Sequence, residues 1–150
     1  MGKLTGKVAI VTGAGGGLGR AHAMLLAHEG AAVIVNDLGG SRDGTGSGSS
    51  MADTVVDEIK AAGGQAAANY GSVTDDGAAE SMVKSAVDHF GRLDILINNA
   101  GILRDRSFKN MTDAEWDAVI DVHLRGSYLA TKHAWQQMMS QGEGGRIIMT

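Results

Sequence analysis

The sequence predicts an α/β fold built on a doubly wound parallel sheet, and three observations support this prediction. Short apolar runs rich in β-branched residues alternate with segments of helical spacing along the chain. These runs show no polar alternation, which is typical of strands covered on both faces. The connections between them are long enough for crossover helices, which join parallel strands. We therefore expect a Rossmann-like domain, truncated after about its fifth strand.

The first half of the chain contains three predicted strands, at residues 7–12, 32–36 and 65–69. The predicted helices between them run from 17 to about 28 and from 51 to 62, and glycine follows each. Residues 38–50 are rich in Gly and Ser and have almost nothing to bury, so we expect a mobile surface loop there.

The third helix is predicted to begin at Thr74 and to end at about Phe90. The Thr74 hydroxyl can cap free amides, and Asp75 and Asp76 suit the positive end of the helix dipole. A fourth strand is expected at 93–98.

A capping box formed by Thr112 and Glu115 predicts the start of a long helix toward Met139, and a fifth strand follows at 146–150. This last strand would be a bare sheet edge, which further strands and helices normally cover. We therefore expect a fragment of a longer protein, in which residues 1–150 form a single incomplete domain.

The composition argues against several function classes. The net charge is -4 and no run of Lys or Arg occurs, so nucleic acid and membranes are not expected as partners. The chain has no cysteine, and its histidines do not stand at metal-ligand spacing, so we expect no disulfide, no metal site and no cysteine nucleophile. Neither a signal peptide nor a long apolar stretch is present, which favours a cytoplasmic protein.

The strongest local motif is the glycine-rich turn TGAGGGLG at residues 12–19. It lies between the first strand and a helix start, where free amides can bind a pyrophosphate. Side chains at Gly13 and Gly17 would hold the backbone away from phosphates, and Gly19 would let the helix lie close to the sheet. The spacing differs from GxGxxG, and the Gly-Lys-Ser/Thr of a P-loop does not follow. A merely flexible turn is the alternative interpretation.

Asp37 ends the second strand, where its carboxylate can accept hydrogen bonds from both hydroxyls of an adenosine ribose. It favours NAD over NADP, because it would repel a 2′-phosphate unless a cation such as Arg42 intervened. The alternative is an Asp that only starts a turn. Residues 98–101, Asn-Asn-Ala-Gly, close the fourth strand at the same edge, where small residues allow a ligand to approach closely and the asparagine amides can bridge loops. A simple turn is the alternative.

These three features, in this order along the chain, resemble the short-chain dehydrogenase/reductase (SDR) family. Within it the chain is similar to the N-terminal part of the (3R)-hydroxyacyl-CoA dehydrogenase domains of peroxisomal multifunctional enzymes of type 2. The resemblance covers nearly the whole chain and is carried by the segments VNDLGG (35–40), AGILRDRSF (100–108), VHLRGS (122–127) and GRIIMT (145–150).

The resemblance implies a site for NAD(P) along the strand ends. Ser72 and Val73 would flank the adenine, whereas Gly71 stands where many relatives have an Asp that receives the adenine amino group. The cofactor-binding residues that the resemblance implies are Gly13, Gly17, Leu18, Gly19, Asp37, Ser72, Val73, Asn99, Ala100 and Gly101.

The resemblance also implies the chemistry. In this family a Tyr with a Lys shuttles the proton and a Ser holds the substrate oxygen, and these residues would lie beyond the fifth strand, so the 150 residues alone should be inactive. His123 stands where an Asn commonly holds a relay water, which an imidazole can also do. A helix histidine with a purely structural role is the alternative. Residues 104–106, Arg-Asp-Arg, either steer an acidic thioester such as acyl-CoA or form a solvated charge cluster.

The predicted function is therefore that of an NAD-dependent oxidoreductase acting on a secondary alcohol or ketone, with a 3-hydroxyacyl-CoA as substrate. The alternatives are a steroid or steroid-CoA dehydrogenase, a dinucleotide-binding module without catalysis, and an S-adenosylmethionine methyltransferase, in which Asn-Asn-Ala-Gly would have no role. Relatives usually form dimers or tetramers, so we expect a homo-oligomer that associates partly through the helix at 112–139.

Overall fold

The computed structural model describes residues 2–150 and contains one five-stranded sheet with the order β3-β2-β1-β4-β5. Every neighbouring pair of strands is parallel. This arrangement confirms the predicted doubly wound, Rossmann-like sheet. The strands are β1 (Val8–Val11), β2 (Ala32–Asn36), β3 (Gln65–Asn69), β4 (Ile95–Asn98) and β5 (Arg146–Met149).

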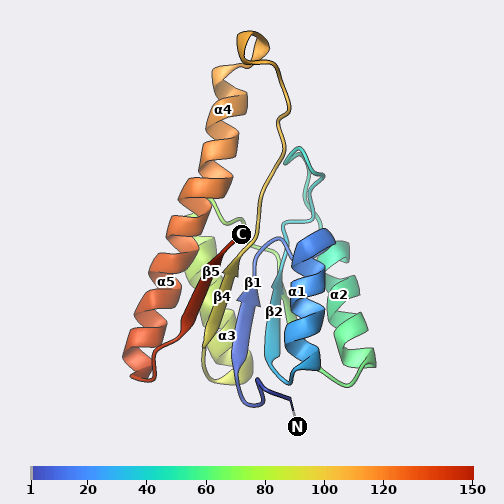
Figure 1. Ribbon diagram of the computed structural model, residues 1–150, viewed down its shortest axis with the longest axis vertical. Coiled ribbons are helices and arrows are strands. Elements are labelled where there is room, and N and C mark those ends of the chain that lie inside the picture. The colour runs from blue at the N-terminus through green and yellow to red at the C-terminus, as the bar shows by residue number, and fades with distance from the viewer. Residues whose placement is uncertain (1) are drawn as a thin grey trace.

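Helices cover both faces of the sheet (Figure 1). On one face lie α1 (Gly17–His28) and α2 (Ser50–Ala61), and on the other lie α3 (Asp76–Phe90) and α5 (Gly126–Gln141). The helix α4 (Asp113–Ile120) continues the line of α5 beyond the ends of the strands, so the molecule tapers away from the sheet (Figure 1).

The core has two halves because successive residues of a strand point to opposite faces of the sheet. Val8 and Ile10 of β1 and Ile34 of β2 pack in the half beneath α3 and α5. Val11 and Val33 pack in the half beneath α1 and α2. Both sides of the central strands β1 and β2 are therefore buried, which explains why their sequence runs lack polar alternation.

The helix α3 is capped one residue later than the sequence predicts. Its N-cap is Asp75, whose carboxylate accepts a hydrogen bond from the Ala78 amide at 2.6 Å. The Thr74 hydroxyl instead lies 2.9 Å from the Ser72 hydroxyl. The prediction that Thr74 caps this helix was wrong, because the neighbouring carboxylate reaches the free amide. The predicted capping box of Thr112 and Glu115 at α4 is confirmed.

The long helix that follows Thr112 is interrupted by a π-helical segment, Asp121–Arg125, between α4 and α5. Such a segment inserts one residue into the helical repeat and occurs frequently at functional sites. The sequence pattern predicted an uninterrupted helix toward Met139, since a single inserted residue leaves little trace in the apolar spacing. His123 lies inside this segment.

A buried carboxylate joins β1 to the start of β4 at the end of the sheet opposite the glycine-rich turn. Asp94 accepts hydrogen bonds from the Val8 amide at 3.0 Å and from Arg92 Nε at 2.8 Å and Nη2 at 2.7 Å. Lys7 Nζ lies 3.3 Å away. Burial acts to raise the pKa of Asp94, but the hydrogen bonds and charge of these neighbours outweigh it and hold the pKa below its ordinary value.

Candidate functional site

A cavity of about 650 Å³ opens at the carboxyl ends of the strands. The chain winds outward from β1 through β2 to β3, and then returns to β4 on the other side of β1. Ligands of doubly wound sheets bind at this kind of switch point. Eight of the ten predicted cofactor residues line the cavity, namely Gly13, Gly17, Asp37, Ser72, Val73, Asn99, Ala100 and Gly101.

The other two predicted residues, Leu18 and Gly19, lie outside the cavity lining. The Leu18 side chain is 72% exposed on the first turn of α1. Gly19 is buried beneath the turn, where an added Cβ would lie only 2.2 Å from the Gly13 carbonyl oxygen and 2.5 Å from Asn99 Nδ2. Glycine at this position allows α1 to approach the strand ends, as the sequence predicted.

The glycine-rich turn leaves backbone amides available at the start of α1. Its N-cap is Gly16, which has no side chain to accept from the first-turn amides. Gly13 and Gly17 have φ of +61° and +52°, in the left-handed region that favours glycine. A Cβ at Gly13 would also lie 2.8 Å from the Ala100 Cα, whereas the space beside Gly17 is open. The turn can therefore bring its amides close to an anion.

The Asp37 carboxylate lies between two loops. Its Oδ2 accepts a hydrogen bond from the Gly15 amide and its Oδ1 accepts one from the Gly39 amide, both at 2.7 Å. A carboxylate oxygen has two lone pairs, so each oxygen retains one for a further donor. The arrangement can fix the glycine-rich turn and receive ligand hydroxyls at the same time.

Asn99 and Thr12 join the glycine-rich turn to the loop after β4. Asn99 Nδ2 donates to the carbonyl oxygens of Thr12 at 3.0 Å and Gly13 at 3.1 Å. The buried Thr12 hydroxyl accepts from the amides of Asn99 at 3.0 Å and Ala100 at 2.9 Å. The sequence suggested that the asparagine amides bridge loops but assigned no role to Thr12. The feature of the sequence that could have identified Thr12 is a hydroxyl residue directly after a fully apolar strand.

Sequence reasoning also missed Asn36, a buried polar residue that lines the cavity. Its Nδ2 donates to Asn69 Oδ1 at 2.8 Å and to the Gly71 carbonyl oxygen at 2.9 Å, which shapes the turn carrying Ser72. A Cβ at Gly71 would lie 3.1 Å from the Ala78 Cβ, so this glycine is closely packed against α3. An amide at the end of an apolar strand was the signal that could have identified Asn36.

His123 lies beside the cavity and contacts the loop after β4. Its Nε2 lies 3.1 Å from the Ile102 amide nitrogen and 3.0 Å from the Ile102 carbonyl oxygen. A Cβ at Gly101 would lie 2.7 Å from His123 Cε1. The π-helical segment thus brings the imidazole against the backbone that follows Asn-Asn-Ala-Gly.

The charged residues after this loop have separate positions. Arg106 Nε pairs with Glu115 Oε1 at 3.0 Å, which ties the loop to the start of α4. Arg104 lines the cavity, as does Arg42 from the loop after β2. The sequence had treated residues 104–106 as one cluster, and the structure directs only its first arginine to the cavity.

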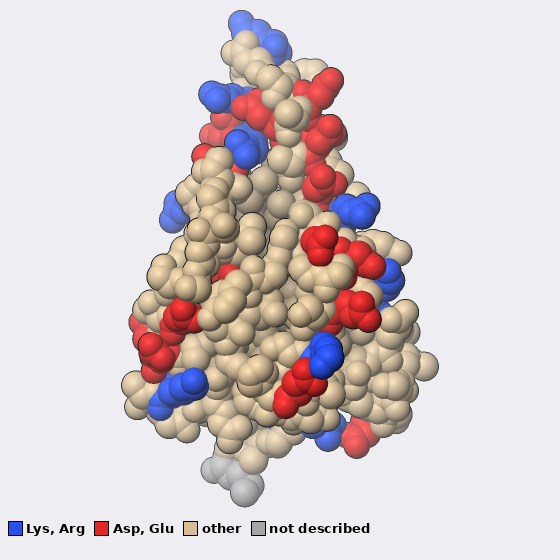
Figure 2. All heavy atoms as spheres, turned by 180° about the vertical axis from the view of Figure 1, so that it is seen from behind, with Lys and Arg blue, Asp and Glu red and all other residues tan. Residues whose placement is uncertain are grey.

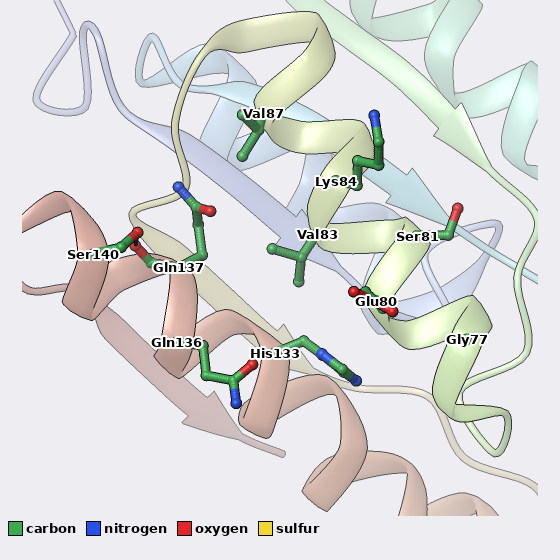
Figure 3. Close-up of a pocket in the computed structure, with 10 residues that line it drawn as sticks. All are labelled: Gly77, Glu80, Ser81, Val83, Lys84, Val87, His133, Gln136, Gln137 and Ser140. Carbon is green, nitrogen blue, oxygen red and sulfur yellow. Dashed lines mark hydrogen bonds between the residues drawn. The ribbon is translucent and has the colours of Figure 1, made fainter.

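A second hollow of about 600 Å³ lies between α3 and α5 (Figure 3). Polar side chains of both helices line it, including Glu80, Lys84 and His133 (Figure 3). Near it the Asp76 carboxylate lies 2.9 Å from both Lys132 Nζ and His133 Nε2. None of the predicted cofactor residues lines this groove. The candidate site is therefore the cavity at the strand ends.

The surface carries charges of both signs. On the side turned away from the viewer in Figure 1, basic and acidic side chains are interspersed, and much of the middle of this face is uncharged (Figure 2). Within residues 2–150, no cluster of three or more His, Cys, Asp or Glu is arranged to hold a metal ion. No helix in the same range combines the length and hydropathy of a membrane span.

Comparisons with known proteins agree with this geometry. Residues 7–150 match the short chain dehydrogenase family. The chain is 57% identical over 148 residues to peroxisomal multifunctional enzyme type 2 of Mus musculus, an alignment that covers 99% of this chain and 20% of that enzyme. It is 48% identical over 152 residues to a hydroxyacyl-CoA dehydrogenase of Mycobacterium tuberculosis, covering 97% of this chain and 45% of that protein.

A solved structure shows the same fold. The crystal structure of a short chain dehydrogenase from Mycobacterium avium matches with a TM-score of 0.88 and 49% identity, over 99% of this chain and 55% of that chain. The chain thus spans between 20% and 55% of the length of these relatives.

Proposed function

Because this chain belongs to the short-chain dehydrogenase family, we propose that it forms the cofactor-binding part of an NAD-dependent oxidoreductase. The observation that carries the proposal is the Asp37 carboxylate, which faces the same cavity as the glycine-rich turn. The turn offers amides to a diphosphate, and the carboxylate accepts from the neighbouring ribose hydroxyls. A 2′-phosphate beside that carboxylate would be repelled.

Calorimetric titration of the full protein with NAD and with NADP tests this proposal. We expect NAD to bind more tightly by about tenfold or more, which corresponds to about 1.4 kcal/mol of charge repulsion. Equal affinities would contradict the role of Asp37. A protein that binds neither nucleotide would contradict the whole proposal.

We propose a 3-hydroxyacyl-CoA as the substrate, oxidised at its secondary alcohol with transfer of the hydride to the nicotinamide and of the proton to solvent. The support is the name of the hydroxyacyl-CoA dehydrogenase among the relatives. The Ser, Tyr and Lys of the family mechanism are expected after residue 150. NADH formation by the full protein from a 3-hydroxyacyl-CoA and from a steroid alcohol compares the two substrate classes, and a higher kcat/KM for the steroid would overturn this choice.

We propose His123 as the residue that holds a relay water, through Nδ1. Its Nε2 faces the Ile102 backbone, so Nδ1 is the nitrogen left for a water. The variant His123→Asn should retain turnover, since an amide can also hold a water, and His123→Leu should lose it with little change in NAD affinity. Equal turnover of the two variants would show that the imidazole is only structural.

We also propose that the protein is a homo-oligomer, a dimer or tetramer that packs partly through α4 and α5. Large apolar side chains on these helices and on the π-helical segment between them are more than half exposed, namely Trp116, Leu124, Tyr128, Trp135 and Met139. Sedimentation of the full protein should give more than one chain per particle, and Leu124→Lys should shift it toward smaller species.

We propose a cytoplasmic location for the protein. Because one relative is named as peroxisomal, imaging of the tagged full protein decides between the two compartments.

A further inference from the structure

Two loops meet across the cavity at the strand ends. The Leu103 amide, after β4, donates to the Arg42 carbonyl oxygen, after β2, at 2.8 Å. At Gly44 an added Cβ would lie 3.0 Å from Ile102 Cγ2, so the Gly44 backbone packs closely against the Ile102 side chain. Figure 1 shows the loop after β2 rising beside the segment that leads to α4. We call residues 38–48 and 101–104 together the strap.

The half of the strap after β2, where the sequence predicted a mobile surface loop, contains several hydrogen bonds within itself. The Gly48 amide donates to the Leu38 carbonyl oxygen and the Ser41 amide to the Thr45 carbonyl oxygen, both at 2.9 Å. Asp43 Oδ1 accepts from the Ser41 hydroxyl at 2.5 Å and from the Thr45 amide at 3.0 Å. These hydrogen bonds hold Arg42 and Gly44 against the other half.

Arg104, in the other half of the strap, has an unsatisfied donor. Its Nε is buried and has no hydrogen-bond partner among the described residues. Arg104 lines the same cavity as Arg42, Gly13 and Asp37. Buried donors in folded proteins almost always have an acceptor, so this one indicates an acceptor that the protein itself does not supply.

The nearby acids do not satisfy this donor. The Asp43 carboxylate is close enough for the Arg104 charge to contribute to its lowered pKa, but its main partners are the hydrogen bonds of Ser41 and Thr45. Glu115 pairs with Arg106 instead. Arg106 is thus a satisfied arginine two residues from an unsatisfied one, and it provides a matched comparison.

We propose that Arg104 is a phosphate-binding residue of this cavity, held in position by the strap. The inference rests on the proposed function, which places an adenine nucleotide here. A guanidinium offers a planar fork of donors that matches phosphate oxygens, and partial burial strengthens the contact. The phosphate belongs either to the diphosphate of the dinucleotide or to the coenzyme A part of the substrate.

Titrations of the full protein distinguish these two sources. The probes are ADP-ribose, which carries the diphosphate, coenzyme A, and uncharged adenosine. Arg104→Gln should weaken the binding of one charged probe by about tenfold or more, and that of adenosine by less than about twofold. Arg106→Gln, the matched control, should change all three affinities by less than about twofold.

Each outcome decides the assignment. A selective loss of ADP-ribose affinity in Arg104→Gln supports contact with the dinucleotide, and a selective loss of coenzyme A affinity supports contact with the substrate. If the wild type binds ADP-ribose and Arg104→Gln loses no more affinity than Arg106→Gln for either charged probe, the assignment is overturned while the proposed function stands. A wild type that binds none of the probes overturns both. An equal loss for adenosine would indicate a disturbed fold and also overturns the assignment.

Discussion

The Asp37 carboxylate accepts a hydrogen bond from the Gly15 amide at 2.7 Å, so the residue that follows β2 also holds the turn that follows β1. Gly15 cannot carry a side chain here, since an added Cβ would lie 2.7 Å from the same carboxylate oxygen. The two loops therefore form one unit. The proposed roles of the Asp37 carboxylate depend on both its negative charge and its shape. A substitution that changes only the charge can separate these two contributions.

Replacing Asp37 by Asn should narrow the preference for NAD over NADP. The amide keeps the size and one acceptor oxygen but removes the negative charge, so repulsion of a 2′-phosphate disappears. We expect the affinity for NADP to rise. The affinity for NAD should fall, by less than about tenfold. Calorimetry measures both constants, and Asp57→Asn in the exposed face of α2 is the charge-matched control. An unchanged ratio of the NAD and NADP affinities would show that Asp37 does not contact the ribose of the nucleotide.

Replacing Gly19 by Ala should destabilise the fold and weaken nucleotide binding. The new Cβ would clash with the Gly13 carbonyl oxygen and with Asn99 Nδ2. The Gly13 backbone cannot move away without opening the glycine-rich turn. Overpacking of this kind costs about 1–3 kcal/mol in unfolding free energy. Denaturant unfolding with and without NAD measures both effects.

Gly77→Ala provides the control for this prediction. Its nearest contact beyond the helix would be Asp75 Oδ1 at an ordinary 3.5 Å. Ala in a helix is favoured over Gly by about 0.5–1 kcal/mol, so this variant should be as stable as the wild type or slightly more stable. If the two variants behave alike, the close approach of α1 to the turn is not important for stability.

A disulfide across the strap should slow the entry and release of NAD. The Cβ position at Gly44 lies 3.6 Å from the Ile102 Cβ, which is within the range of a disulfide. The chain has no cysteine, so Gly44→Cys with Ile102→Cys would introduce a single bridge. Stopped-flow fluorescence of NADH should give slower association and dissociation for the oxidised form, by about tenfold.

The reduced double variant and the two single variants control for the positive φ of Gly44, +83°, which strains any other residue. Their rates should match one another and exceed those of the oxidised protein. Identical rates before and after reduction would show that nucleotides enter the cavity without opening the strap.

The stability of the fold should fall below about pH 4, in part through Asp94. The pKa of this carboxylate is lowered in the folded state, so its contribution is fully present above the unfolded pKa and is lost as the pH falls through the folded pKa. Asp94→Asn should lose roughly 2–3 kcal/mol at pH 7, because Arg92 and the Val8 amide lose a charged partner. Urea unfolding from pH 7 to 3 should show a shallower acid dependence in the variant, and parallel curves would exclude Asp94 as a contributor.

The sequence was sufficient to predict the sheet and most of the cavity. Strands such as Val8–Val11 are buried on both faces, and that burial is visible as an apolar run. Glycine motifs and strand-end residues such as Asp37 were predictable because parallel strands bring their carboxyl ends to one edge. The helix N-cap was misplaced by one residue, since Thr74 and Asp75 both have capping side chains.

The remaining features depend on contacts between distant segments. The meeting of Arg42 with Leu103 brings together residues far apart in the sequence, and no local pattern encodes it. The same is true of the separate directions of Arg104 and Arg106, which appear as one charge cluster in the sequence. Asn36 and Thr12 were overlooked because a polar residue at a strand end also occurs in ordinary turns.

The π-helical segment Asp121–Arg125 determines how far α5 is rotated about the helix axis relative to α4. Each residue of an α-helix advances the side-chain direction by about 100°. Deleting one residue from this segment would therefore rotate α5 relative to α4 by about that angle. Ala130 and Ala134, which now pack in the core against the sheet, would swing sideways unless the capped end at Thr112 turned instead. The one inserted residue lets each half keep the orientation that its own neighbours require.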